Sequence, residues 1–265
     1  MSWNNATSYV RDIVNKRAAK HGLYESQSNE DRDLPLGVRI GALVTLQKAP
    51  FIEAALNGSL ITEPEGNALP IRAVSRVHLN LSGKLYRYFL HTGDDDEQQT
   101  YLQVLLDAHG NVTEVLYCTQ LTRIVPESAE DQDAYMGLSG AGLGDSTYTL
   151  WRAQLAELGA AEADLAAAFG TSDQLVYSRD AGDPAQAFVA PFTGHETRID
   201  DAAGEHGLAQ RLHFMPYARK MGSGREYLLI ATEIVDSRDG DASRRAIHVD
   251  FTIAIPLDVN RISIQ

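Results

Sequence analysis

The chain has 265 residues, a net charge of −13 and a hydrophobic content of 44%. That length is sufficient for one large β domain or two domains of ordinary size. The acidic balance argues against nucleic-acid binding, which depends on cations facing phosphates. The single cysteine, Cys118, excludes an intrachain disulfide, and we find neither a signal-peptide core nor a run of about 20 apolar residues. We therefore expect a soluble, cytoplasmic protein.

Residues 1–33 are expected to form an N-terminal helix and a linker. Val10, Ile13 and Val14 recur at helical spacing within residues 8–20, and Gly22 follows as a stop signal. Residues 1–20 carry a net charge of +3 in an otherwise acidic chain. Such a segment suits weak contact with an anionic membrane surface or with the acidic body of its own protein, and the plainer alternative is an ordinary or frayed terminal helix.

Residues 34–135 are expected to form a first β-rich unit. Its firmest element is a hairpin in which Ser82-Gly83 supplies the turn, because apolar residues alternate before it and aromatic residues follow it. Short loops join the later strands, which predicts a meander. The predicted strands are residues 38–44, 77–81, 85–90, 101–106 and 112–117, with a short helix at residues 50–57.

Residues 136–170 are expected to be a glycine-rich linker and a helical segment that joins the two halves. From Pro126 to Asp145 the chain has acidic residues and glycines but no Lys or Arg. Residues 146–169 then place Trp151 and Leu155 at helical spacing, which predicts a helix broken at Gly159.

Residues 171–265 are expected to form a second β-rich unit. Its most regular stretch is 247–255, where large apolar residues occupy every second position and therefore one face of a strand. Residues 226–235 precede it, and Asp239-Gly240 between the two predicts an antiparallel hairpin. Further strands are expected at 174–177, 187–190, 196–199, 212–219 and 261–264. The predicted fold class is α+β, predominantly antiparallel β.

The motifs that carry chemistry are incomplete. The run Gly140–Gly144 is followed by Asp145 where a nucleotide-binding loop needs glycine, and it lies after an acidic linker. His195-Glu196 begins like a zinc helix, but Ile199 occupies the second ligand position. The acidic loop at residues 94–97 lacks the glycine and glutamate of a calcium-binding EF-hand. Cys118 lies in an apolar strand that does not favour a thiolate.

Two looser groups remain open as ligand sites. His195, His206 and His213, with Glu196 and Glu205, contain the donor types of an imidazole–carboxylate metal site. Strand tyrosines are also able to line a recognition groove, although such residues usually pack in cross-strand pairs. These tyrosines are Tyr86, Tyr88, Tyr101, Tyr217 and Tyr227. Similar Tyr-rich strand pairs occur in both halves, around Tyr86 and Tyr217, so an internal duplication is a further hypothesis.

Four short motifs resemble the bacterial YjfK-like family, whose function is uncharacterised. They are Leu36–Gly41, Leu85–Leu90, Tyr101–Val104 and Glu226–Leu229, and the similarity covers roughly residues 34–265. The resemblance implies no catalytic residues. It implies a genomic context of phage-shock-protein-A-like membrane-stress proteins, small membrane proteins and an ATP-grasp ligase.

The sequence therefore assigns no catalytic residue, cofactor or metal ligand. Our first hypothesis is a non-enzymatic module that binds another protein or itself, in an envelope-stress system, through strands whose edges pair with a partner. The rival is an enzyme or a small-ligand or metal-binding protein whose site is assembled from distant residues, near the three histidines or the tyrosines.

Overall fold

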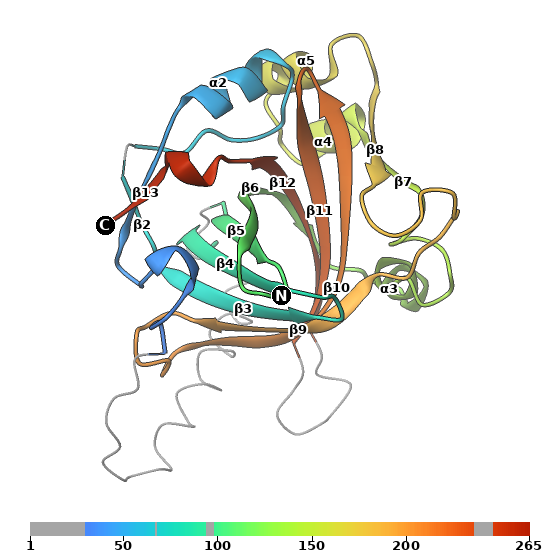
Figure 1. The fold of residues 1–265 in the computed structure, drawn as a ribbon. Helices are drawn as coiled ribbons and strands as arrows, with labels where there is room; N and C mark the ends of the chain where they lie inside the picture. Colours follow the sequence, from blue (N-terminus) through green and yellow to red (C-terminus); the bar gives the residue numbers. More distant parts are fainter. Residues whose placement is uncertain (1–29, 67, 94–97, 236–245) are drawn as a thin grey trace.

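The computed structural model describes residues 30–66, 68–93, 98–235 and 246–265 (Figure 1). Within these residues, ten strands form one antiparallel sheet in the order β11-β12-β6-β5-β4-β3-β9-β10-β8-β7. Strand β11 also pairs with β10, so eight of the ten strands close into a barrel, and β8 and β7 extend from it. The helix expected at residues 8–20, the 94–97 loop and the Asp239-Gly240 turn lie outside the described residues.

The strands differ widely in length, and the longest ones build the closed part of the sheet. A second, small sheet has the order β13-β1-β2. The strands are β1 (Leu43–Leu46), β2 (Leu69–Pro70), β3 (Ala73–Leu79), β4 (Lys84–His91), β5 (Thr100–Leu106), β6 (Val112–Ile124), β7 (Thr147–Trp151), β8 (Gln174–Arg179), β9 (Phe192–Ile199), β10 (Gly207–Met221), β11 (Gly224–Val235), β12 (Ala246–Pro256) and β13 (Ile262–Ile264).

Short helices lie between the strands. The α-helices are α2 (Ala49–Leu56), α3 (Ala129–Met136), α4 (Arg152–Glu157) and α5 (Glu162–Phe169), and the 3-10 turns are η1 (Pro35–Gly37) and η3 (Val259–Arg261). Within the described part of the chain, no helix is long and apolar enough to cross a membrane.

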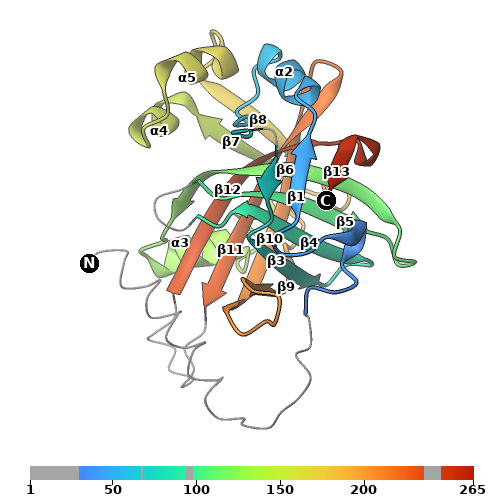
Figure 2. The ribbon, with the colours of Figure 1, turned by 90° about the vertical axis from the view of Figure 1, so that its left-hand side faces the viewer.

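Both faces are buried over much of the barrel wall, which explains why several strands are almost continuously apolar, whereas β9 keeps an exposed outer face. The small sheet and α2 cover the outer face of strands β3–β6, while α4, α5, β7 and β8 cover β10–β12 (Figure 2). Phe51 of α2, for example, meets Tyr117 of β6 edge to face, with ring centroids 4.8 Å apart. A third apolar cluster, which includes Phe89, Tyr101 and Leu229, lies on the opposite face of the wall, inside the barrel.

Strand β12 shows which face of the barrel wall each set of alternating residues occupies. Its large apolar residues, including Val249, Phe251 and Ile253, belong to the core between the barrel and its covering layer. The residues between them, including Asp250, therefore point into the barrel. The apolar face that the sequence indicates is the outer face of the wall, and the polar face is the interior.

The predominantly antiparallel β architecture is confirmed. The predicted hairpin is β3–β4, the meander continues through β5 and β6, and β11 pairs antiparallel with β12. The helix predicted at residues 50–57 is α2, and the break at Gly159 is present. Strands from the two predicted β-rich units interleave in the same barrel, because β3 pairs with β9 and β6 pairs with β12.

Four local predictions were wrong. Residues 147–151 are strand β7, not helix, because Thr, Tyr and Trp side chains favour a pleated strand when one face packs. The first strand begins at Leu43 because η1 and Gly41, with φ +88°, turn the backbone before it. The strand expected at residues 187–190 is reduced to a single bridge at Phe188. The acidic part of the expected linker contains α3, whose first turn Ser128 caps.

Candidate functional sites

The barrel interior contains a buried network of charged side chains. Arg87 of β4 donates from Nη1 to Oε2 of Glu196 over 2.9 Å, and the same nitrogen lies 3.8 Å from Glu233 Oε1. All three side chains are at most 7% exposed. Gln210 of β10 donates to the same Glu196 oxygen over 3.3 Å. The network therefore links β4, β9, β10 and β11 across the barrel.

The network continues toward the end of β11 and the start of β12. His248 lies 2.6 Å from Glu233, measured from Nε2 to Oε2. Arg123 of β6 donates from Nε and Nη2 to the two carboxylate oxygens of Asp250, each over 2.5 Å. Its Nη2 also lies 3.8 Å from Glu233. Each carboxylate in this part of the network therefore faces at least one arginine or imidazole.

The carboxylates of Glu233 and Asp250 have opposite pKa shifts. Burial would raise the pKa of Glu233, but the hydrogen bond and charge of His248, together with Arg123 and Arg87, lower it to about 2. Burial and the neighbouring charge of Glu233 raise the pKa of Asp250, against the lowering effect of Arg123. The network thus favours one firmly ionised carboxylate beside one that is harder to ionise.

The same residues contain a possible metal-ligand set. Glu233, His248 and Asp250 each offer a ligand atom, and these atoms lie within 4.8 Å of one another. Arg123 already binds both oxygens of Asp250, and His248 is at hydrogen-bond distance from Glu233. An ion would have to displace these partners and would meet the positive charge of Arg123. We therefore assign an ion-pair network here, and no metal.

A row of polar side chains crosses the interior beside this network. Ser75, Arg87 and Gln103 are direct neighbours on β3, β4 and β5, and all are buried. Four buried atoms of this row, with Gln210 of β10 included, have no hydrogen-bond partner among the described residues: Ser75 Oγ, Arg87 Nε, Gln103 Oε1 and Gln210 Oε1. These atoms give the core the capacity to bind small polar molecules such as water. None of these four residues lines either of the two hollows on the surface beside α2.

Cys118 lies in this interior and is fully buried. Burial is the largest influence on its thiol and raises its pKa well above the ordinary value, although Arg87 acts in the opposite direction. A thiol that stays protonated is a poor nucleophile and a poor metal ligand. The expected burial of Cys118 in an apolar strand is confirmed.

The three histidines of the suggested metal site do not converge. His206 is exposed, and its Nδ1 lies 3.0 Å from Asp201 Oδ2. His213 is half-buried on β10, with Nδ1 3.1 Å from the carbonyl oxygen of Met136, and burial lowers its pKa. His195 is exposed on β9, where its ring stacks on His78. The glutamate at position 196 points to the other side of the wall, toward Arg87.

The strand tyrosines are also divided between different layers. Tyr88 and Tyr217 belong to the two cores outside the barrel wall, whereas Tyr101 and Tyr227 belong to the cluster inside it. Tyr86 is only partly buried beside the first core. These side chains pack as cores, so they do not form one recognition groove.

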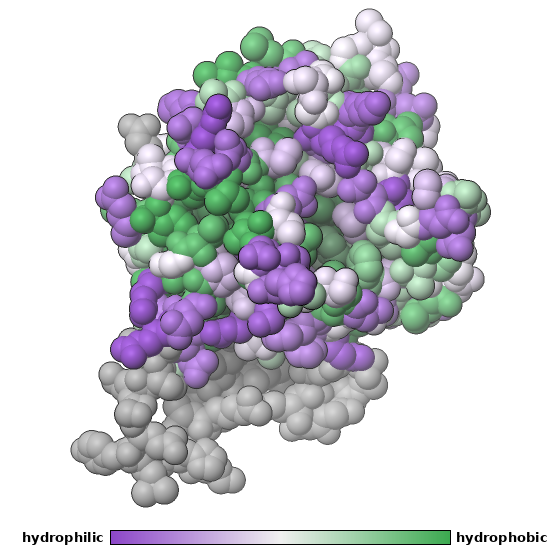
Figure 3. All heavy atoms as spheres, viewed as in Figure 1, coloured by the Kyte–Doolittle hydropathy of each residue, from purple (hydrophilic) through white to green (hydrophobic). Residues whose placement is uncertain are grey.

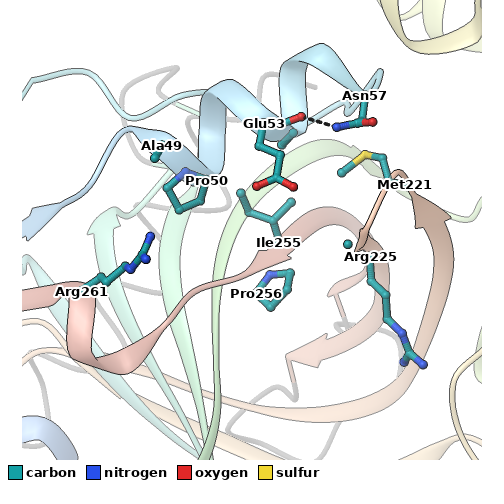
Figure 4. A pocket seen from close by; sticks show the side chains of 11 residues that line it. Ala49, Pro50, Glu53, Asn57, Met221, Arg225, Ile255, Pro256 and Arg261 are labelled. Atoms are coloured by element: carbon teal, nitrogen blue, oxygen red, sulfur yellow. Dashed lines mark hydrogen bonds between the residues drawn. The ribbon is translucent and has the colours of Figure 1, made fainter.

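A shallow groove lies between α2, the β10–β11 turn and the end of β12. It encloses about 260 Å³, less than the roughly 300–1,000 Å³ of small-molecule sites. Figure 4 shows Glu53 pointing toward Ile255 and Pro256, while the Arg225 side chain points away. A smaller hollow shares Pro50 and Arg261 with it. Figure 3 shows apolar side chains gathered on this face over the small sheet.

Strand β7 is the last strand of the large sheet and pairs only with β8 among the described residues. The amide of Arg179 donates to the Ser146 carbonyl over 2.9 Å, and that of Arg152 donates to Asp173 over 3.0 Å. Antiparallel hydrogen-bonded pairs alternate along a ladder, so positions 146, 148, 150 and 152 direct their backbone groups toward β8. Thr147, Thr149 and Trp151 therefore direct theirs to the open side.

The open side of β7 is covered only at its start. Phe188 bridges to Asp145, and the amide of Val189 donates to the Gly144 carbonyl over 2.9 Å. The residues before Phe188 turn away from β7, because Arg179 donates to the carbonyls of Asp183, Gln186 and Ala187. The three outward-directed positions of β7 lie beyond this bridge, without a partner strand in the described part of the chain.

Together, the fold and its sites define a closed eight-stranded β barrel with a buried ionic core. Strands β8 and β7 form an appended two-stranded ribbon, and among the described residues the outer edge of β7 is open. Comparison of the chain with protein-family models, curated proteins and solved structures finds no match. The chain's function is therefore argued from its own residues.

Proposed function

We propose that this protein binds an extended segment of another protein, which adds as a further strand to β7. The observation that carries the proposal is the row of outward-directed backbone groups on Thr147, Thr149 and Trp151. Thr147 and Thr149 each offer an N–H and a C=O, and Trp151 offers its N–H. An added strand satisfies these groups through main-chain hydrogen bonds, as in other cases of β-augmentation.

The residues of β7 do not protect this edge. Open edges usually carry charges, proline or a bulge that discourage pairing, and the edge strand β2 of the small sheet ends in Pro70. Strand β7 contains two threonines, a tyrosine, a leucine and a tryptophan, with no charge and no proline. Its composition therefore favours pairing with a further strand.

The exposed face of the ribbon offers side-chain contacts to the same partner. Trp151 and Val176 are each 47% exposed, and they occupy diagonal positions because Trp151 pairs with Gln174 and Val176 pairs with Thr149. Diagonal neighbours in a sheet are within reach of an aromatic side chain. Tryptophan is frequently an energetic anchor in interfaces. A partner segment with apolar residues at alternate positions fits this face.

The other regions of the molecule support this proposal over the small-ligand alternative. The histidines and tyrosines that the alternative requires are dispersed, and the barrel interior is occupied by its own ion pairs and apolar cluster. The YjfK-like resemblance adds the expectation of a partner from an envelope-stress system, and the lone buried thiol suits the cytoplasm. Partner identification and cell fractionation test these two points.

Site-specific photo-crosslinking in the native host tests the proposal. A benzophenone amino acid at Thr147 is expected to crosslink the partner, whereas the same residue at Thr197 is the matched control. Thr197 is also an exposed threonine, but its strand β9 is paired on both edges, with β3 and β10. A crosslinked product with twice the mass of the chain would instead identify self-association.

Two substitutions at Thr149 distinguish the contribution of the backbone to partner binding from that of the side chain. Thr149→Pro removes the outward N–H without removing a bond to β8, and proline is tolerated on an open edge. Thr149→Val keeps the N–H and the side-chain shape. We expect the valine variant to retain the crosslinked partner and the proline variant, with its fold intact by circular dichroism, to lose it. Equal capture by both variants would contradict strand addition.

A further inference from the structure

Two exposed histidines face each other on the outer surface of the barrel, away from β7. His78 of β3 and His195 of β9 are directly opposite in the strand register. Both are exposed, and their rings stack with centroids 5.0 Å apart and planes inclined by 13°. Two imidazoles on neighbouring strands thus occupy one patch of surface.

The backbone holds this pair in place. The amide of Asn80 donates to the Thr193 carbonyl over 2.9 Å, and its Oδ1 accepts from the Thr193 amide over 2.8 Å. Between these contacts and the pair, Gly194 lies so close to β3 that a Cβ would be 1.8 Å from the His78 carbonyl oxygen. A side chain at position 194 would therefore separate the strands. Its absence keeps the two histidines at a fixed spacing.

The spacing suits a shared transition-metal ion. Imidazole nitrogens bind zinc at about 2.0–2.1 Å, so two rings on one tetrahedral ion have centroids about 5 Å apart. The observed 5.0 Å separation meets this requirement. Parallel stacked rings do not aim their nitrogens at one point, so binding needs rotation about the Cβ–Cγ bonds. That torsion is broad and soft, and both rings are at the surface.

The charges around the two histidines weaken the binding of a metal ion without preventing it. Arg211 of β10 lies opposite His195, and Arg76 lies two positions before His78 on the same strand. Arg76 forms an ion pair with Glu30 and also donates to the Glu30 carbonyl. Two nearby guanidinium groups disfavour a cation, so the imidazoles must provide the binding energy through nitrogen ligation.

We propose that His78 and His195 form a two-histidine site for a divalent transition-metal ion such as Zn²⁺, Ni²⁺ or Cu²⁺. Imidazole favours these ions over Mg²⁺ and Ca²⁺, which prefer oxygen ligands, and water completes the coordination. The site is independent of strand addition at β7.

Calorimetric titration of the full chain, without a histidine tag, tests the site. We expect one equivalent of Zn²⁺ to bind at pH 7.5 and Mg²⁺ not to bind. His78→Gln and His195→Gln are each expected to weaken binding by about tenfold or more, because the second ligation step is intramolecular. His109→Gln and His206→Gln, two exposed histidines away from the pair, are the matched controls and are expected to bind as the unchanged chain does.

Electron paramagnetic resonance of the Cu²⁺-loaded chain provides a second readout. The signal is expected to show two coupled nitrogens in the unchanged protein and to lose one in either glutamine variant. Zinc affinity that survives both substitutions, or a copper signal that is the same in all variants, would overturn the assignment. Absence of any Zn²⁺ or Cu²⁺ binding by the folded, unchanged chain would also overturn it.

Discussion

Arg87 and Glu196 share a 2.9 Å hydrogen bond inside the barrel, although they are 109 residues apart and their strands, β4 and β9, lie on opposite sides of β3. Both side chains are at most 5% exposed. The pair joins the first and last thirds of the chain in one buried contact.

Replacing Arg87 is expected to destabilise the fold strongly. Arg87→Met leaves Glu196 without its arginine and removes a cation from Glu233, so we expect a loss of about 3–5 kcal/mol in the free energy of unfolding, measured in urea. Arg87→Met with Glu196→Gln removes the unpaired charge and is expected to recover part of that loss. A loss below about 1 kcal/mol for Arg87→Met alone would contradict a paired, desolvated contact.

Acid is expected to destabilise the barrel through Glu233. Its pKa is about 2 in the fold and near 4.5 when unfolded, so its contribution is fully present above pH 4.5 and lost as the pH falls toward 2. Asp250 acts in the opposite direction because its pKa is raised in the fold. Its contribution to the free energy of unfolding is present at low pH and is lost as the pH rises through the raised pKa.

The Glu233→Gln variant tests this effect, and it also removes the charge that helps to raise the pKa of Asp250. We expect its unfolding free energy, followed from pH 5 to pH 2, to change less steeply than that of the unchanged chain. Parallel curves for the two proteins would show that Glu233 does not titrate with a lowered pKa.

Glu226 of β11 forms hydrogen bonds that connect this strand to β8 and to the segment after α2. This fully buried carboxylate accepts from Tyr177 over 2.6 Å, from Arg219 over 2.6 Å and from the Leu60 amide over 2.8 Å. We expect Tyr177→Phe to cost about 1.5–3 kcal/mol in thermal or urea unfolding, because it removes a hydrogen bond to a charged acceptor. An unchanged midpoint for Tyr177→Phe would refute this role.

Cys118 is expected to be unreactive in the folded protein. Its burial keeps the thiol protonated and out of contact with reagents. A thiol reagent such as Ellman's reagent should label it at a rate that rises with denaturant together with unfolding. Rapid stoichiometric labelling in native buffer would show that the interior opens to solvent.

Local patterns identified much of the fold because they depend on neighbours in sequence. The hairpin around Ser82-Gly83 and the alternation in residues 247–255 are properties of short segments. Which distant strands pair is set by packing and barrel closure, so the contacts of β3 with β9 and of β6 with β12 had no local signal.

The candidate sites were harder to predict. Arg87, Glu233 and Asp250 each interrupt a run of strand-forming residues, which is a weak signal for a polar interior, but their mutual contacts depend on barrel closure. Strand β7 was missed because Trp151 and Leu155 are four residues apart, which matches a helix. Trp151 instead ends the strand and Leu155 lies in the next helix. The exposed edge lies in that misread segment.

Amide hydrogen exchange at Thr149, measured by nuclear magnetic resonance, tests strand addition most directly. In the free protein we predict fast exchange at Thr149 and slow exchange at Tyr148 and Leu150, which face β8. With the crosslinked partner present, Thr149 should become protected. A Thr149 amide that is already protected in the free protein, or that still exchanges fast in the complex, would contradict the proposal that β7 is where the partner binds.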